Sequence, residues 1–394
     1  MAVPRPVRYT YSMPRPIRFA RPVLVMNARE RIDIVERALV SVRGHVDGAF
    51  ISVTPGDPLG GELVRLLKRL DIPGHVFAFK RGDGGQMRSD LFHYAELHAA
   101  QFGTTHWLNV DADDEIQATG GTLAESIDAA GDEPVWEFRE VEVASGHEWR
   151  FPRVFRAGLG WRWRYPLHEI PFCRAAPLDP YTPPPLLEGF TYIRHTDTHS
   201  GPERFAEHAR RIEAWQALPG NAYDARMRFY KGVSWHAAGE YARAIDAFGE
   251  HIALGLTCES SWYSRYSIGR CLESLDDTVA AIGAHIDAAT MRPTRAEPMV
   301  ALVRLYRARG DHHAALEWSK LAASLRLPVG DACFIERDVY AWVARDELAM
   351  CLAAVDLGDA AADVWRSVLA CPSLPAEQRQ RVVECLAALA IAAG

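Results

Sequence analysis

The sequence is poor in lysine and lacks the cysteine spacings and long apolar runs that mark several classes of protein. Only four of its 44 basic residues are lysines, and the 394-residue chain has a formal net charge of −7. That charge argues against a surface that binds nucleic acid throughout. The seven cysteines form no CxxC pair, and no apolar run reaches membrane-spanning length. We therefore expect a cytoplasmic protein with reduced, mostly buried thiols and no transmembrane segment.

Residues 1–21 predict a basic N-terminal arm rich in proline and arginine. This stretch carries five arginines and no acidic residue, and it lacks the apolar core of a signal peptide. Its alternating prolines prevent a helix and favour an extended chain. Two interpretations stay open, namely a flexible or surface-draped arm and a contact for an anionic surface or a partner domain.

Residues 22–204 predict an α/β domain. Apolar runs at 22–26, 48–54, 75–79 and 106–110 indicate strands, and apolar residues recur at helical spacing over 32–42, 63–70 and about 87–101. This alternation implies a mostly parallel sheet with helices on both faces, in which ligands bind beyond the carboxyl ends of the strands. Residues 130–200 are rich in Trp, Arg, Pro and Gly and contain short strand-like pieces such as VWEFREVEV and TYIRHT. They predict an irregular continuation of the same domain, in which an acceptor pocket could be built.

Residues 205–394 predict an all-α domain of helical repeats. Gly232 and Gly269, 37 residues apart, occupy matching places in two similar segments, and two later segments that contain Gly310 and Gly358 are more degenerate copies. Small residues at such steps let paired helices pack closely. The pattern resembles tetratricopeptide (TPR) repeats, with a generic helical bundle as the alternative. Such an array suits a peptide, a protein acceptor or a second subunit as partner, or it only supports the first domain.

The segment WLNVDADDEI at 107–116 ends a predicted buried strand with four acids in five positions. In an extended chain, residues two apart face the same way, so Asp111 and Asp113 converge. Two or three oxygen ligands together with a substrate diphosphate suit Mg²⁺ or Mn²⁺. A solvated turn is the alternative interpretation of the same acids.

The order of motifs over residues 22–290 resembles the family 2 glycosyltransferases of the GT-A fold. Asn27-Ala-Arg-Glu30 stands where the family has N-E-E, Arg88-Ser89 matches its Arg-Asn pair, Asp111 to Glu115 matches its DADE, and the stretch RVFRAGLGWRWRYPLHEIPF resembles its R-L-F-R … W … V-H-E segment. Helical repeats after the transferase domain also occur in this family. The second strand departs from the family pattern, because VTPGDP places Thr54 at the base-binding aspartate and shifts Asp57.

The resemblance implies a metal-dependent, inverting glycosyltransferase that moves a sugar from a nucleotide-sugar donor, most simply a UDP-sugar, to an acceptor hydroxyl of a protein, glycan or other molecule. Glu169 would be the general base, with Asp197 and Glu140 next in line. Mn²⁺ or Mg²⁺ would be held by Asp111, Asp113 and His168. The donor-binding residues would be Asn27, Glu30, Thr54, Asp57, Arg88 and Asp111.

Other interpretations remain. The chain could be a nucleotidyltransferase that uses the same acidic edge on a related sheet, or an inactive TPR scaffold that binds a protein. His195, Asp197 and His199 share one face if extended, which leaves open a zinc site, an active-site loop or plain structural polarity. The cluster WRWRYP at 161–166 would stack on a sugar or nucleobase, or pack by cation–π contacts beneath the site.

Overall fold

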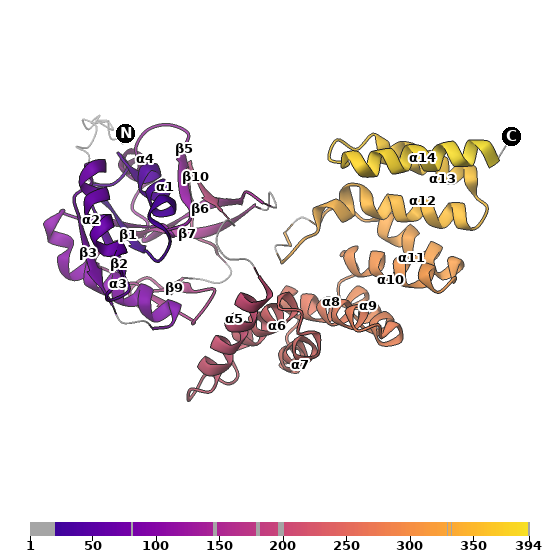
Figure 1. The fold of residues 1–394 in the computed structure, drawn as a ribbon, viewed down its shortest axis with the longest axis horizontal. Coiled ribbons are helices and arrows are strands. Elements are labelled where there is room, and N and C mark those ends of the chain that lie inside the picture. The colour runs from indigo at the N-terminus through magenta and orange to yellow at the C-terminus, as the bar shows by residue number, and fades with distance from the viewer. Residues whose placement is uncertain are drawn as a thin grey trace, which may run out of the picture. The chain divides into compact units, whose positions relative to one another are not determined.

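The computed structural model describes residues 20–79, 82–144, 148–178, 182–195, 201–328, 330–331 and 333–392. Residues 1–19 of the basic arm, and Asp197 and His199, lie outside this range. The chain forms two compact units, an α/β unit and a helical unit that begins at Gly201, whereas the sequence predicted a start at residue 205 (Figure 1).

The α/β unit is built on an eight-stranded sheet in the order β3-β2-β1-β4-β7-β6-β10-β5, while β8 and β9 form a separate pair. The pairs β1–β2, β1–β4, β2–β3 and β6–β10 are parallel, and β4–β7, β6–β7 and β5–β10 are antiparallel. The strands are β1 (Pro22–Asn27), β2 (Ala49–Val53), β3 (Gly74–Ala78), β4 (His106–Asn109), β5 (Glu115–Ala118), β6 (Val135–Glu142), β7 (Glu148–Arg156), β8 (Arg162–Arg164), β9 (Ile170–Phe172) and β10 (Leu186–Arg194).

Helices cover both faces of this sheet, as predicted. Alternate residues of β1 point to opposite faces, so Leu24 and Met26 pack with α1, α2 and α4 while Val23 and Val25 pack with α3. The helices are α1 (Ile32–Val42), α2 (Leu59–Leu70), α3 (Gly84–His98), the 3₁₀ turn η1 (Ala99–Gln101) and α4 (Leu123–Ala130). The parallel strands β1 to β4 end at one edge of the sheet, which is where α3 begins.

The prediction of an irregular segment at 130–200 is wrong for much of its length. β6, β7 and β10 supply three adjacent strands of the main sheet, and β6 and β7 pair antiparallel over most of their lengths. These strands carry buried charged residues, such as Glu140 and Arg153. These charged residues interrupt the apolar alternation that marks a strand in the sequence.

The second unit consists of helical repeats. The helices α6–α7, α8–α9, α10–α11 and α12–α13 pack as consecutive pairs, each pair contacts the next, and α14 packs on α13 (Figure 1). The helices are α5 (Pro202–Gln216), α6 (Ala225–Ala237), α7 (Tyr241–Ile252), α8 (Glu259–Ser274), α9 (Thr278–Met291), α10 (Glu297–Ala308), α11 (His312–Ser324), the π-helical η2 (Val339–Val343), α12 (Ala344–Ala354), α13 (Gly358–Leu369) and α14 (Ala376–Ala392). No helix in the described ranges is long and apolar enough to cross a membrane.

The repeated glycines let helices of one pair approach closely. A Cβ atom on Gly232 of α6 would lie 2.5 Å from the ring of Phe248 on α7. A Cβ on Gly269 of α8 would lie 2.4 Å from the ring of His285 on α9. Both distances are shorter than real Cβ contacts, so a larger residue at either position would force the facing ring to shift. The matching residues of the sequence repeat therefore do the same packing task in two successive pairs.

The described part of the connection between α11 and η2 (residues 325–328, 330–331 and 333–338) reaches back to the earlier pair α8–α9. Arg292, which follows α9, binds both carboxylate oxygens of Asp331 at 2.6 and 2.9 Å. The backbone N–H of Cys333 donates to Glu259 of α8, and the ring of Phe334 stacks on Tyr263 at 4.5 Å. This connection therefore joins helix pairs that are not adjacent in the chain.

We expect the helical unit to lose stability as pH falls from about 6.5 to about 4. Burial, with the charges of Arg228 and Arg265, lowers the pKa of His251 to about 4, and its Nδ1 lies 2.9 Å from the hydroxyl of Ser264. In the unfolded chain His251 binds a proton near pH 6.5, whereas in the folded chain it binds one only near pH 4. Between these values acid therefore favours the unfolded state. Urea unfolding across this range should show a smaller loss for His251→Asn than for the wild type. An equal loss in both would exclude His251 as a source.

Candidate functional site

An ion-pair cluster lies where β4, β6, β7 and β10 meet the start of α3. Its centre is Asp111, the second residue after β4. Asp111 Oδ1 binds Arg88 Nη2 at 2.5 Å, and Asp111 Oδ2 binds Arg153 Nη1 at 3.1 Å. Arg153 Nε also binds Glu140 Oε1 at 2.7 Å, and this pair is almost fully buried. Arg88 Nε lies 3.8 Å from Glu169 Oε2. The cluster thus runs Glu169–Arg88–Asp111–Arg153–Glu140.

Tyr192 of β10 completes the surroundings of Asp111. Its hydroxyl accepts the Asp111 N–H at 2.9 Å and donates to Asp111 Oδ2 at 3.2 Å. The Arg153 guanidinium lies 3.7 Å from the centre of the Tyr192 ring. Burial alone would raise the pKa of Asp111, but the charges of Arg88, Arg153 and Arg194 hold that pKa well below its usual range. Asp111 is therefore ionised and held by three neighbouring groups.

The loop before β9 presents Glu169 to the start of α3. Tyr165 and His168 have φ values of +82° and +50°, a region that residues with a side chain rarely occupy. The N–H groups of Gly84 and Gly85 donate to the carbonyls of Pro166 and Tyr165 at 3.0 and 2.9 Å. Such backbone strain is often found at functional sites. The loop is thus fastened to α3 and carries Glu169 at its end.

Gly84→Ala is expected to lower the free energy of unfolding by about 1–3 kcal/mol, the usual cost of overpacking. An added Cβ would lie 1.6 Å from Glu169 Oε1 and 2.9 Å from the Pro166 carbonyl oxygen, so the loop must shift. Gly82→Ala is the matched control, because its Cβ would lie at least 3.5 Å, an ordinary contact distance, from any neighbour. Chemical denaturation of both variants checks this. Equal midpoints for the two would mean that Glu169 does not pack against α3.

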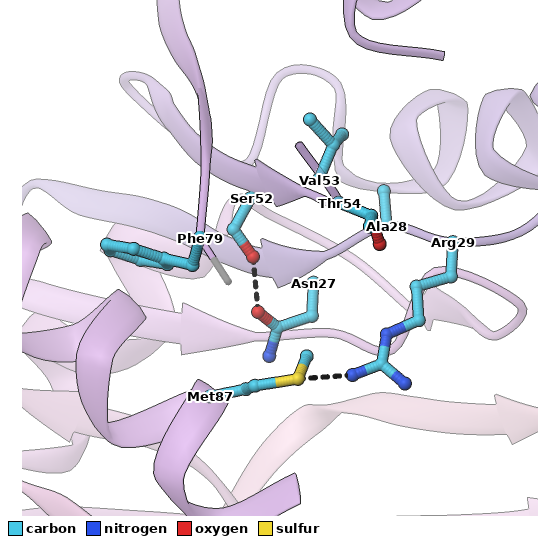
Figure 2. A pocket seen from close by; sticks show the side chains of 8 residues that line it. All are labelled: Asn27, Ala28, Arg29, Ser52, Val53, Thr54, Phe79 and Met87. Carbon is cyan, nitrogen blue, oxygen red and sulfur yellow. Dashed lines mark hydrogen bonds between the residues drawn. The ribbon is translucent and has the colours of Figure 1, made fainter. Parts of the chain in front are cut away.

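A narrow pocket of about 10 Å³ lies at the carboxyl ends of β1 and β2 (Figure 2). Ser52 Oγ donates to Asn27 Oδ1, and Arg29 Nη2 contacts Met87 Sδ. Met87 directly precedes Arg88, so this pocket and the ion-pair cluster adjoin through α3. The lining residues are Asn27, Ala28, Arg29, Ser52, Val53, Thr54, Phe79 and Met87.

The structure places the predicted donor-binding residues in two groups. Asn27 and Thr54 line the pocket, and Arg88 and Asp111 bind each other in the cluster. The other two lie apart from these groups. Asp57 Oδ1 accepts the Leu59 N–H at 2.9 Å, which fixes the start of α2. Glu30 lies in the bend after β1, half-buried, and is not among the residues that line the pocket.

The predicted metal ligands are not assembled into a three-ligand centre. Within the described ranges, no three His, Cys, Asp or Glu side chains are grouped to hold a metal ion. Asp111 is neutralised by two guanidiniums, which would repel a dication beside it. The backbone carbonyl of Asp113 accepts from Arg37 Nη2, and His168 is exposed. These residues do not fit a metal held by the protein alone, and a metal that arrives with a donor diphosphate stays a prediction.

Asp114 was not predicted as a functional residue, and for His195 and the WRWRYP cluster the sequence left several interpretations open. Burial and the Asp111 charge raise the pKa of Asp114 to about 7, and its Oδ1 accepts the His195 N–H at 3.0 Å. His195 Nε2 lies 3.1 Å from Glu115 Oε1. Trp161 and Trp163 are buried in the core, with the Arg88 guanidinium 5.2 Å from the Trp163 ring. The aromatic cluster therefore packs beneath the site, as the second interpretation held.

No protein-family model and no curated protein matches this chain. Among solved structures, that of MamA shares 18% identity over 42% of this chain and 88% of that chain, with a TM-score of 0.35. MamA from Desulfovibrio magneticus RS-1 shares 16% over 43% and 89%, with a TM-score of 0.33. A thermophilic TPR protein of Thermus thermophilus shares 16% over 47% and 91%, also with a TM-score of 0.33. Likenesses this partial leave the function of the chain to be argued from its own geometry.

Proposed function

We propose that the α/β unit is a glycosyltransferase module that binds a nucleotide-sugar donor at the carboxyl edge of its sheet. The observation that carries this proposal is the meeting of Arg88, Asp111 and Glu169. They come from α3, from the end of β4 and from the loop before β9. The resemblance to family 2 glycosyltransferases implies a role in sugar transfer for each of them. A mostly parallel sheet of this kind binds ligands at this edge.

In this proposal each residue has a defined task. The Arg88 guanidinium turns from Asp111 to the donor diphosphate, since a guanidinium binds both groups through the same paired N–H bonds. Glu169 accepts the proton of the acceptor hydroxyl as that oxygen attacks the anomeric carbon. Asn27 and Thr54 contact the nucleoside. A base does not fit the present 10 Å³ space, so Arg29 and Met87 must separate when the donor binds.

Metal dependence, with Mn²⁺ or Mg²⁺ carried in on the donor diphosphate, remains part of the proposal. A divalent ion there would supply charge that stabilises the leaving diphosphate. The chain's own contribution is to free Asp111 Oδ1 when Arg88 moves to the phosphates, while Oδ2 stays bound to Arg153 and Tyr192.

An interaction scaffold is the second candidate, and it too has a specific observation in its favour. Both oxygens of Asp111 are occupied by guanidiniums, which is the arrangement of a closed and inactive site. The helical repeats, meanwhile, provide the extended surface on which such proteins bind partners. A protein partner or a second copy of the chain would then be the ligand of the whole molecule.

A donor panel tests these alternatives. The full chain is incubated with UDP-, GDP- and dTDP-sugars, with Mn²⁺ or with EDTA, while melting temperature and released products are measured. Release of the nucleoside diphosphate supports the glycosyltransferase, even by slow hydrolysis without an acceptor. In a parallel incubation with a nucleoside triphosphate and a sugar 1-phosphate, release of pyrophosphate indicates a nucleotidyltransferase. If no donor raises the melting temperature and none is turned over, the interaction scaffold is the candidate that remains.

A further inference from the structure

The helical unit contains an open cleft that the glycosyltransferase proposal does not use. It is lined by residues of α10 to α14 and has a volume of about 520 Å³, which is within the usual range of ligand sites. Its lining residues are Arg304, Arg307, Ala308, His312, Met350, Ala353, Ala354, Trp365 and Cys385.

One wall of the cleft is cationic. Arg304 and Arg307 of α10 have side chains that are 57% and 31% exposed, and both bind the carboxylate of Glu347. Arg304 does so through Nε alone, at 2.6 Å from Oε1. One carboxylate serving two guanidiniums leaves a net positive charge. Because Glu347 is only 5% exposed, it holds both guanidiniums in fixed positions at the cleft.

The remaining lining is mostly apolar. Met350, Ala353 and Ala354 come from α12, and Trp365 from α13. The two alanines leave the hollow unfilled. A second buried acid of α12, Asp346, accepts from Trp365 Nε1 at 2.9 Å and binds Arg381 at 2.5 Å. That acid is already neutralised and does not oppose an anion in the cleft.

We propose that this cleft binds a short acidic peptide segment in which glutamate or aspartate alternates with apolar residues. A carboxylate of the peptide would bind the outer nitrogens of Arg304 by charge-assisted hydrogen bonds. Apolar side chains of the peptide would pack on Met350 and Trp365, and this contact would remove their apolar surface from water. An extended segment suits the site because the cleft lies open along the surface of several helices. The inference is independent of the glycosyltransferase proposal.

Fluorescence polarisation with the full chain tests the charge requirement. The probe is a fluorescein-labelled decapeptide of alternating glutamate and leucine, and a peptide with lysine in place of glutamate is its counterpart. Arg304→Gln should weaken binding about tenfold, because the charge-assisted hydrogen bonds to the peptide carboxylate are lost. Arg307 still pairs with Glu347 in this variant, so the fold is retained. Arg309→Gln, at the end of the same helix but outside the cleft, should bind normally.

Alkylation of cysteines locates the peptide. Cys385 lines the cleft, whereas Cys258 is exposed elsewhere in the helical unit. Saturating glutamate–leucine peptide should slow modification of Cys385 several-fold, by mass spectrometry, and leave Cys258 unchanged. Equal binding of the lysine peptide, equal loss in both arginine variants, or unprotected Cys385 would each overturn the proposal. Displacement of the peptide by dodecanoate at equal concentration would do so too, and would indicate a site for lipid carboxylates.

Discussion

Glu169→Gln is expected to reduce the rate of sugar transfer about 10²–10⁴-fold, the usual contribution of a general base. Glutamine retains the shape of the side chain beside Arg88 but cannot accept a proton. Donor binding should change little, because the Glu169 carboxylate contacts the Arg88 guanidinium only at 3.8 Å, whereas Asp111 binds it closely. Single-turnover assays and nucleotide binding, measured together, separate the two effects.

The control for this prediction is Glu188→Gln, which removes an exposed carboxylate from β10 and should leave transfer unchanged. An unaltered kcat in Glu169→Gln would move the base elsewhere. Glu140 would be a poor replacement, because it is 1% exposed and bound to Arg153. Loss of donor binding in Glu169→Gln would instead assign the residue a place in holding Arg88.

Arg295→Met is expected to destabilise the helical unit by about 3–5 kcal/mol, the usual cost of removing one partner of a buried ion pair. Arg295 and Glu297 have side chains that are 0% exposed and are joined by two bonds of 2.8 and 3.0 Å. The Arg295 guanidinium also lies 3.8 Å from the centre of the Trp262 ring. Without it, the Glu297 carboxylate keeps only the Tyr340 hydroxyl, at 2.7 Å, as a charge-stabilising side chain.

Guanidinium chloride unfolding followed by circular dichroism measures this effect. Arg292→Met is the matched control, because Arg292 is 28% exposed and its loss should cost less, about 1 kcal/mol. The double variant Arg295→Met/Glu297→Leu should be more stable than Arg295→Met alone, since no buried charge is left unpaired. A double variant that is less stable than either single one would contradict this account.

The first half of the sheet could be predicted because its strands are apolar on both faces. β1, β2 and β4 are fully buried apart from Asn27, and their runs are separated by amphipathic helices. Of the later strands, β6 and β10 were predicted only as short strand-like pieces, and β7 was not predicted as a strand. Buried ion pairs such as Glu140–Arg153 place charged residues in the middle of these strands, and the partner that neutralises the charge lies on the neighbouring strand, 13 residues away.

Separation along the sequence between interacting residues also limits prediction of the candidate site. Asp111 and Glu169 stand in motifs that a sequence displays directly, and the structure brings both to Arg88. Arg153 and Tyr192 lie 42 and 81 residues from Asp111, and nothing local marks them as its partners. Arg153 is the first residue of the segment RVFRAGLGWRWRYPLHEIPF, but nothing in the sequence assigned it a role. Charge pairing within a sheet depends on strand order, which adjacent residues do not encode.

The α11–η2 connection changes how the helical array should unfold. In a stack where each pair contacts only its neighbours, the end pairs can detach one after another. Here the salt bridge from Arg292 to Asp331 and the stack of Phe334 on Tyr263 join early and late parts of the array. Helices α8 to α12 are therefore tied into a single cooperative block, so that pulling on the C-terminal end would meet resistance there in one step rather than in a series.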